Sequence, residues 1–353
     1  MQLDDLGEFA LIDRIVAHLG EAAARDIVVP SGDDAAAWTT VEGYAVATID
    51  ALVEGTHFRR DTMSMADVGW RAVAANVSDL AAMGAEPQYL LVATLLGPDV
   101  TLEDVDGLAQ GIGEACAAMG VRVAGGDIVR AATTGLSIAA YGRARQTTDD
   151  IPALLRRGGA RPGDRVAVSG HIGAAAAGLV LIQTGRSNHV AAAPLVRAHR
   201  RPVGRVALGR AALALGVRCA IDCSDGLLQD LGHIAQRSHV GIEVALAQVP
   251  VHPAAVELLG AQAALDLALG GGEDFELVLT GSREALMALD GTQRSGSAGA
   301  DIPRSGREED VPVTLIGRVV AEHPGKVIAW AEDGSVYEPP RRGWDQTRDT
   351  GER

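Results

Sequence analysis

Lysine is almost absent from this sequence of 353 residues, since Lys326 is the only one. It lies in the segment "HPGKVIA", without the upstream glycine and the following serine or threonine of a P-loop, so a Walker-type phosphate site is excluded. The "HRD" and "DFG" motifs of protein kinases are also missing. If the protein uses a nucleotide, it has to hold the phosphates mainly through metal ions and arginines.

Cysteine, net positive charge and long apolar runs are scarce as well. The three cysteines provide neither a disulfide framework nor a zinc site, and we expect them to be reduced core residues. A formal net charge of -15 is poorly suited to nucleic acid or to an anionic membrane. No apolar run is long enough to span a bilayer, and the N-terminal segment carries acids where a signal peptide carries basic residues. We therefore expect a cytoplasmic protein that binds neither nucleic acid nor membranes.

Apolar runs alternate with helical patterns along the chain, which favours an α/β fold of the mixed α+β kind. The length predicts two domains, which we place at residues 1–150 and 151–345. The junction is expected in "ALLRRGGARPGDRVAVSG", where a Pro-Gly turn precedes a new strand. The polar, Gly/Ser-rich residues 290–310 are predicted to form a mobile loop, and residues 346–353 a frayed tail.

The hydrophobic patterns predict individual strands and helices. One helix is bounded by Thr101, which can cap it, and by Gly120, which can close it. Strands are expected at 43–50, 89–96, 121–127, 135–144, 241–247, 275–281, 313–320 and 326–331, and one more leads into Asp222. Helices are expected at 64–84 and 101–120, after "SGHIG", near 202–215, and from Asp225 onward.

Carboxylates follow several of the apolar runs, most of them beside glycine. The segments are "VVPSGDD" (Asp33, Asp34), "VATID" (Asp50), "VAGGD" (Asp127), "AIDCSD" (Asp222, Asp225) and "GGGED" (Glu273, Asp274). Asp79 stands three residues after Asn76, on nearly the same helical face. Ligand-binding loops gather at the ends of strands, and carboxylates that converge there need cations. Oxygen ligands fit Mg2+ or Mn2+, and such ions beside glycine-rich turns suit phosphate chemistry.

Each of these stretches also has a purely structural interpretation. Ser224 or Asp225 would cap the helix that follows, and Gly-Asp pairs usually form turns. His57, Arg157 and Trp344, taken singly, are typical of surface or packing residues. Only the combined set favours a metal–phosphate site.

Short motifs in a fixed order cover the chain from residue 7 to residue 345. They are "GEFALIDRI", "SGDDAA", "TIDALVEGTHF", "NVSDLAAMGAEP", "GGDIVR", "RRGGARPGD", "SGHIGAAAAG", "AIDCSDGLLQDLGH", "GGEDFEL" and "RRGWD". The set resembles the thiamine-monophosphate kinases, a family of the aminoimidazole-ribotide-synthetase-like superfamily. The segments "NVSDLAAMGA", "SDGL" and "GGEDFEL" are the most specific to it.

The resemblance implies a fold, an activity and an assembly. The fold is a two-domain synthetase-like one, in which the N-terminal domain pairs across a homodimer. The implied reaction moves the γ-phosphate of ATP directly and in line onto the phosphate of thiamine monophosphate, which gives thiamine diphosphate. Several Mg2+ ions are the implied cofactors.

The resemblance also assigns residues, motif by motif. Asp127 and Arg157 are implied to act on the transferring phosphate. The implied metal ligands are Asp34, Thr48, Asp50, Asp79, Asp127, Asp222 and Asp225. The implied ATP contacts are Gly126, Asp127, Arg157 and Ser224, and the implied thiamine-phosphate pocket contains His57, Glu273 and Trp344.

Two positions depart from the family pattern, because Ile49 and Ile128–Val129 stand where many relatives carry hydroxyl residues. Alternative functions remain within the same superfamily. Aminoimidazole ribotide synthetase fits the "GGEDFEL" and "RRGWD" segments less well. Selenophosphate synthetases rely on a cysteine or selenocysteine and a lysine that the first hundred residues lack, and the hydrogenase-maturation relative ends in a cysteine. A non-catalytic cation-binding protein is a further alternative, although "DCSDGLLQDLG" lacks the ligand spacing of an EF-hand.

Overall fold

The computed structural model describes residues 8–23, 27–29, 37–38, 43–145, 153–295 and 311–344. Asp34, residues 296–310 of the predicted loop and the predicted tail at 346–353 lie outside this part of the chain. The chain forms two compact units. The first contains the described residues up to Leu154 together with Arg200–Arg210, and the second contains Leu155–His199 and the described residues from Ala211 onward. The predicted boundary at residue 150 does not account for the segment Arg200–Arg210, which belongs to the first unit.

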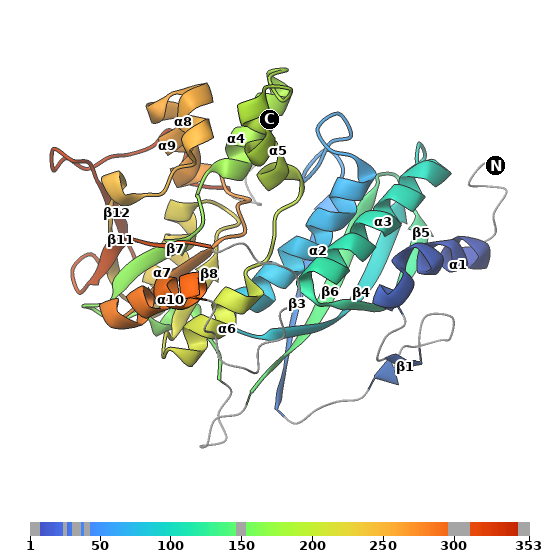
Figure 1. Ribbon diagram of the computed structural model, residues 1–353, viewed down its shortest axis with the longest axis horizontal. Helices are drawn as coiled ribbons and strands as arrows, with labels where there is room; N and C mark the ends of the chain where they lie inside the picture. Colours follow the sequence, from blue (N-terminus) through green and yellow to red (C-terminus); the bar gives the residue numbers. More distant parts are fainter. Residues whose placement is uncertain are drawn as a thin grey trace. The chain divides into compact units, whose positions relative to one another are not determined.

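A four-stranded sheet with the order β3-β6-β4-β5 forms the centre of the first unit. Its β3–β6 and β4–β6 pairs are antiparallel, and its β4–β5 pair is parallel. Helices α2 and α3 lie against one face of this sheet, and α1 lies beside α3 (Figure 1). The bounds are α1 Glu8–Leu19, η2 Gly20–Ala23, β3 Tyr44–Val53, α2 Met65–Ala82, β4 Glu86–Leu96, α3 Leu102–Met119, β5 Arg122–Arg130 and β6 Gly135–Ala144, with β1 (Ile27–Val29) and β2 (Ala37–Trp38) in a separate pair.

Apolar residues spaced along α2 hold it to the sheet. Val73 and Leu80 are fully buried and share one core with Ile138 of β6.

Polar caps fix the helix ends: the Ser64 side chain accepts the N–H of Asp67 at the start of α2. A capping box at Thr101 begins α3, and Gly120 ends it in the left-handed conformation, as the sequence predicted.

The segment Arg200–Arg210 is attached to the first unit by polar contacts. The Arg201 guanidinium pairs with Asp67 of α2 and with Glu114 of α3, each at 2.6 Å. It also lies over the ring of Trp70, 5.4 Å from the centroid, and the indole N–H of Trp70 donates to the Pro202 carbonyl at 2.6 Å. These contacts link the two helices that cover the sheet.

The second unit contains a six-stranded sheet with the order β12-β9-β11-β7-β10-β8. The β12–β9 pair is parallel, and the other pairs are antiparallel. The strands are β7 Arg165–Ser169, β8 Cys219–Asp222, β9 Gly241–Ala245, β10 Leu277–Gly281, β11 Val313–Val320 and β12 Val327–Trp330. The helices that lie wholly in this unit are η3 Arg157–Gly159, α4 Ala174–Gln183, η4 Val190–Ala192, α7 Leu227–Ser238, η5 Leu246–Gln248, α8 Pro253–Leu259, α9 Ala261–Gly270 and α10 Arg283–Ser295. Two further helices, α5 Ala193–Arg200 and α6 Val206–Ala214, have part of their length in the first unit.

The three cysteines are free and buried, which confirms the prediction that they serve as core residues. Cys116 lies in the core of the first unit, and Cys219 and Cys223 lie in the core of the second. Burial raises the pKa of the Cys116 thiol to about 12, so this thiol is protonated and unreactive at neutral pH.

The mixed α/β fold is confirmed. The strand at 135–144 was predicted to the residue, and the strand expected near 313–320 is also present. Two expectations were wrong. Residues 290–295 belong to α10 rather than to a loop, because Leu286 and Leu289 bury one face of that helix. Asp50 and Asp127 do not end their strands, since β3 continues to Val53 and β5 to Arg130. An exposed carboxylate does not interrupt a strand whose backbone is paired on its neighbour. In the part of the chain that is described, no helix is long and apolar enough to cross a membrane.

Candidate active site

In the first unit, α2 and β3 bring three of the expected metal ligands together. The Thr48 hydroxyl donates to Oδ2 of Asp79 at 2.6 Å. One turn earlier on α2, Oδ1 of Asn76 accepts the backbone N–H of Asp50 at 3.2 Å, while its amide donates to the Ala72 carbonyl at 2.9 Å. The three-residue spacing of Asn76 and Asp79 therefore directs both side chains toward the same strand, as expected.

Asp127 lies on the opposite edge of that sheet. Across the strands, Asp50 faces Ile138, Ile138 faces Val92, and Val92 faces Gly126. Three strand spacings therefore separate Asp50 from the Gly126–Asp127 pair, a distance of roughly 14 Å. The structure does not bring Asp127 into the group formed by Thr48, Asp50 and Asp79.

Gly126 is required where β5 lies beside β4. A Cβ at this position would stand 2.1 Å from the Val92 carbonyl oxygen, closer than any side chain tolerates. The absence of a side chain lets the exposed backbone of Gly126 and Asp127 remain in the sheet. The expected role of Gly126 as a backbone contact of ATP stays a prediction.

His57 follows β3 and is half-buried. Its Nδ1 accepts the N–H of Val53 at 3.1 Å, which assigns the proton of the neutral ring to Nε2. The structure also describes two residues at the positions that depart from the family pattern. Ile49 is 66% exposed and Val129 46% exposed, so these positions present apolar groups in place of hydroxyls.

In the second unit, the segment Ser224–Gly226, here called the SDG turn, joins β8 to α7. Asp222 ends β8 and is only 3% exposed, while Ser224 and Asp225 are half-buried. Gly226 is the N-cap of α7 and has no side chain to cap it. The expectation that Ser224 or Asp225 caps this helix was therefore wrong.

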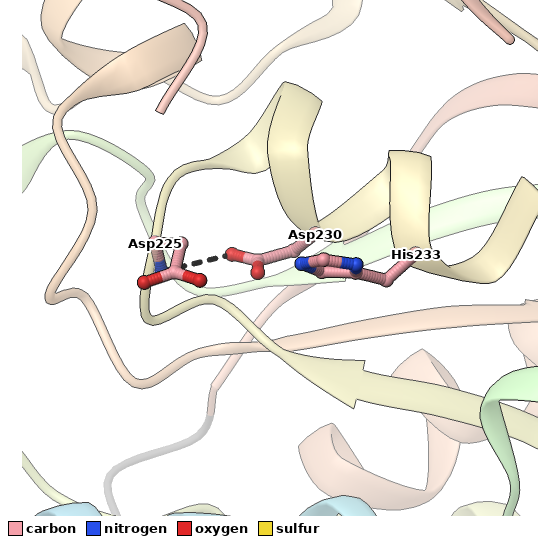
Figure 2. Close-up of side chains that lie close together, drawn as sticks. All are labelled: Asp225, Asp230 and His233. Carbon is pink, nitrogen blue, oxygen red and sulfur yellow. Dashed lines mark hydrogen bonds between the residues drawn. The ribbon is translucent and has the colours of Figure 1, made fainter. Parts of the chain in front are cut away.

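Asp230, in the first turns of α7, supplies an acceptor for the turn that precedes the helix. Its Oδ2 accepts the backbone N–H groups of Ser224, Asp225 and Gly226 at 3.1, 3.2 and 3.1 Å. Figure 2 shows this carboxylate between Asp225 and the ring of His233. Atoms of Asp225, Asp230 and His233 lie within 4.8 Å of one another. We did not predict Asp230 as a site residue, although an acid four residues after a helix-starting glycine is a usable signal.

The SDG turn is hydrogen-bonded to two more of the expected site residues. The N–H of Glu273 donates to the Ser224 carbonyl at 2.8 Å, and the N–H of Trp344 donates to the Asp225 carbonyl at 2.9 Å. The Gln229 amide donates both to Oδ2 of Asp225, at 3.2 Å, and to the Trp344 carbonyl. Hydrogen bonds thus join four expected site residues from three distant parts of the sequence: Ser224, Asp225, Glu273 and Trp344.

The loop that carries Glu273 has an unusual backbone. Gly272 has φ +69°, and a Cβ there would lie 2.5 Å from the Ser224 carbonyl oxygen, so only glycine fits against the SDG turn. Glu273 itself has φ +63°. The next residue, Asp274, accepts the N–H groups of Gly173 at 2.7 Å and Ala175 at 3.0 Å, and so caps α4.

Arg157 lies in η3, with an exposed side chain. Its carbonyl accepts hydrogen bonds from the hydroxyl of Ser238 at 2.9 Å and the thiol of Cys219 at 3.5 Å, which fix its backbone to α7 and β8. No hydrogen bond joins its guanidinium to the described residues of the SDG turn. The ring of Trp344, by contrast, has the guanidinium of Arg341 over one face, 4.9 Å from the ring centroid.

Negative charge gathers around the SDG turn. Burial raises the pKa of Asp230 well above its ordinary value, and the charges of Asp222 and Asp225 raise it further. Burial also raises the pKa of the Cys223 thiol, and the carboxylates of Asp230, Asp274 and Asp222 add to this shift. A divalent cation would relieve this repulsion. The oxygen donors in both units, with no cysteine among them, fit Mg2+.

The chain is similar to known proteins in sequence and in structure. Residues 32–144 match the family "AIR synthase related protein, N-terminal domain". Thiamine-monophosphate kinase of Escherichia coli K12 is 34% identical over 344 residues, which cover 96% of this chain and 98% of the relative. The crystal structure of thiamine-monophosphate kinase from Stenotrophomonas maltophilia K279a has a TM-score of 0.78 and 35% identity, with 96% of this chain and 99% of that chain covered.

A ThiL structure complexed with AMPPCP and TMP is similar as well, with a TM-score of 0.71 and 30% identity. The similarity covers 98% of this chain and 99% of that chain. By sequence and structure over nearly its whole length, the chain belongs to the thiamine-monophosphate kinase family.

Proposed function

We propose that this protein transfers the γ-phosphoryl group of ATP directly to the phosphate of thiamine monophosphate, which yields thiamine diphosphate and ADP. The observation that carries the proposal is the hydrogen-bonded group around the SDG turn. It joins a residue expected to contact ATP (Ser224), one expected to bind metal (Asp225) and two expected to bind thiamine phosphate (Glu273 and Trp344). The similar ThiL structure holds an ATP analogue together with TMP, which supports the same pair of ligands here.

The carboxylates of both units are proposed to hold Mg2+. When bound, these ions neutralise phosphate oxygens and reduce the repulsion between the two anionic substrates. The ligands in the first unit are Thr48, Asp50, Asp79 and Asp127, and those in the second are Asp222 and Asp225. Asp34, outside the described residues, remains a proposed ligand from the sequence.

The remaining residues bind and orient the substrates. The phosphate of thiamine monophosphate is largely ionised at neutral pH, so the reaction needs no strong general base. Gly126 offers its backbone to ATP, and Arg157 supplies a positive charge for the transferring group. The Nε2–H of His57 is a donor for the acceptor phosphate, since Nδ1 is already engaged. The face of Trp344 opposite Arg341 suits the cationic thiazolium ring, and Glu273 adds a negative charge.

Three proposals about the whole protein follow from the family resemblance. The protein is a cytoplasmic homodimer that pairs through its N-terminal domain. Residues 1–150 form this ATP- and Mg-binding domain, and residues 151–345, apart from the segment Arg200–Arg210 that packs with the first unit, form the C-terminal α/β domain.

An acceptor panel tests the proposed function. Purified protein is incubated with ATP and MgCl2 and with thiamine monophosphate, thiamine or no acceptor, and the products are separated by chromatography. We expect thiamine diphosphate only from thiamine monophosphate, and none in the presence of EDTA. Thiamine monophosphate left unchanged at every Mg2+ concentration contradicts the proposal and favours another ATP-using member of the superfamily.

A further inference from the structure

Asp230 is the most deeply buried carboxylate beside the SDG turn, with 1% of its surface exposed. A single oxygen, Oδ2, accepts three consecutive backbone N–H groups, those of Ser224, Asp225 and Gly226. Figure 2 shows the bond to Asp225. The family resemblance assigns no role to this residue.

The turn depends on this acceptor. Three N–H groups point at one place, and each of them would lose its partner if the oxygen moved. The backbone that they fix carries the side chains of Ser224 and Asp225. The carbonyls of the same two residues accept the N–H groups of Glu273 and Trp344. A shift of Oδ2 therefore displaces four residues of the proposed site together.

We propose that Asp230 is a positioning residue for phosphoryl transfer, which acts through the SDG turn as a hydrogen-bond acceptor rather than as a metal ligand. This inference rests on the proposed function. Three backbone donors engage Oδ2, so only Oδ1 is left for a cation, and the Mg2+ dependence of the variants tests whether Asp230 binds one. The nearness of His233 to Asp225 and Asp230 is then a packing feature.

Two substitutions separate the acceptor from the carboxyl group. Asp230→Asn keeps an acceptor oxygen at the same distance from the backbone and removes the carboxyl group. Asp230→Glu keeps the carboxyl group and displaces the oxygen by one methylene. We expect Asp230→Asn to retain kcat within about threefold of the wild type, a change of less than 1 kcal/mol. We expect Asp230→Glu to lose about 10- to 100-fold in kcat, because displacements on the scale of 1 Å cost that much.

The Mg2+ concentration for half-maximal rate distinguishes positioning from metal binding. It stays at the wild-type value in Asp230→Asn and in the control His233→Asn. A strong increase in this Mg2+ concentration in Asp230→Asn, with or without one in His233→Asn, overturns the proposal. A higher kcat in Asp230→Glu than in Asp230→Asn also overturns it. If Asp230→Glu fails to fold, Asp230→Asn still decides, since a folded Asn variant with kcat more than tenfold below wild type also overturns it.

Hydrogen exchange tests the inference without turnover. We expect the amides of Ser224–Gly226 to remain protected in Asp230→Asn and to exchange faster in folded Asp230→Glu. Equal protection in both variants contradicts the positioning role. A wild-type protein that makes no thiamine diphosphate refutes the proposed function and with it the catalytic part of the inference. The exchange result then still shows whether Asp230 holds the turn.

Discussion

The two units position their carboxylates in different ways. In the first, Asp50 and Asp127 are exposed residues of a sheet, and Asp79 stands on a helix that packs against it. In the second, Asp222 is buried at a strand end, and Asp225 lies in a turn that Asp230 holds by hydrogen bonds to its backbone. Regular structure is sufficient to direct the first set, whereas the second depends on a local hydrogen-bond network.

Burial adds a second difference between the units. An exposed carboxylate keeps its hydration, but Asp222 and Asp230 are removed from water and repel each other. A cation therefore relieves more electrostatic repulsion around the SDG turn than around β3. It follows that substitutions of the exposed carboxylates in the first unit report mainly on chemistry, and those of the buried carboxylates in the second report on chemistry and stability together.

The largest effect is expected from removing one metal-ligand charge in either unit. Asp79→Asn and Asp225→Asn should each reduce kcat/KM by about 100- to 1,000-fold, the usual loss for an electrostatic group at a reacting phosphate. Both should keep the fold, because an amide oxygen can still accept from Thr48 at position 79 and from Gln229 at position 225. Steady-state rates and circular dichroism measure the two properties. Normal turnover in both variants would show that the metal assignment is wrong.

Glycine substitutions test how strongly the stability of each unit depends on close backbone packing. Gly126→Ala should destabilise the protein by about 1–3 kcal/mol, because the new Cβ meets the Val92 carbonyl. Gly272→Ala should cost about 1–2 kcal/mol more, since its left-handed backbone adds strain to the contact with Ser224. Urea unfolding gives both values. Gly232→Ala on α7 is the control: it has no atom within 4 Å of the new Cβ and should be neutral or stabilising.

The Asp274 cap predicts a pH dependence of stability in the second unit. Burial raises its pKa from 3.8 to about 7 in the folded protein. Between these values the folded state binds a proton that the unfolded state lacks, so the free energy of unfolding falls as pH rises. The slope from this group is at most about 1.4 kcal/mol per pH unit. Denaturation from pH 4 to 8 without divalent cations measures it. An equal slope in Asp274→Asn would exclude Asp274 as the cause.

The smallest effect is expected at a helix cap in the first unit. Thr101→Ala removes the capping box of α3 and should cost about 1 kcal/mol of stability. It should leave kcat unchanged, because no proposed site residue contacts that cap. A large loss of activity would mean that the carboxylates of the first unit also depend on local hydrogen bonds outside the site, as Asp225 does in the second unit.

Sequence patterns predicted the parts of the molecule that regular structure determines. The spacing of Asn76 and Asp79, the caps of α3 and the strand that ends at Asp222 all follow from local periodicity. The role of Asp230 does not, because it depends on three N–H groups whose directions arise only when the turn has formed. The place of Arg200–Arg210 in the first unit depends on tertiary contacts of Arg201, which no local pattern encodes.

The central claim is Mg2+-dependent transfer from ATP to thiamine monophosphate, and 31P NMR of the wild-type reaction tests it most directly. With MgCl2, we expect the thiamine monophosphate signal to be replaced by the two signals of thiamine diphosphate while an equal amount of ADP appears. With EDTA in place of MgCl2, the spectrum should not change. If ADP and inorganic phosphate accumulate while thiamine monophosphate remains, the account is contradicted.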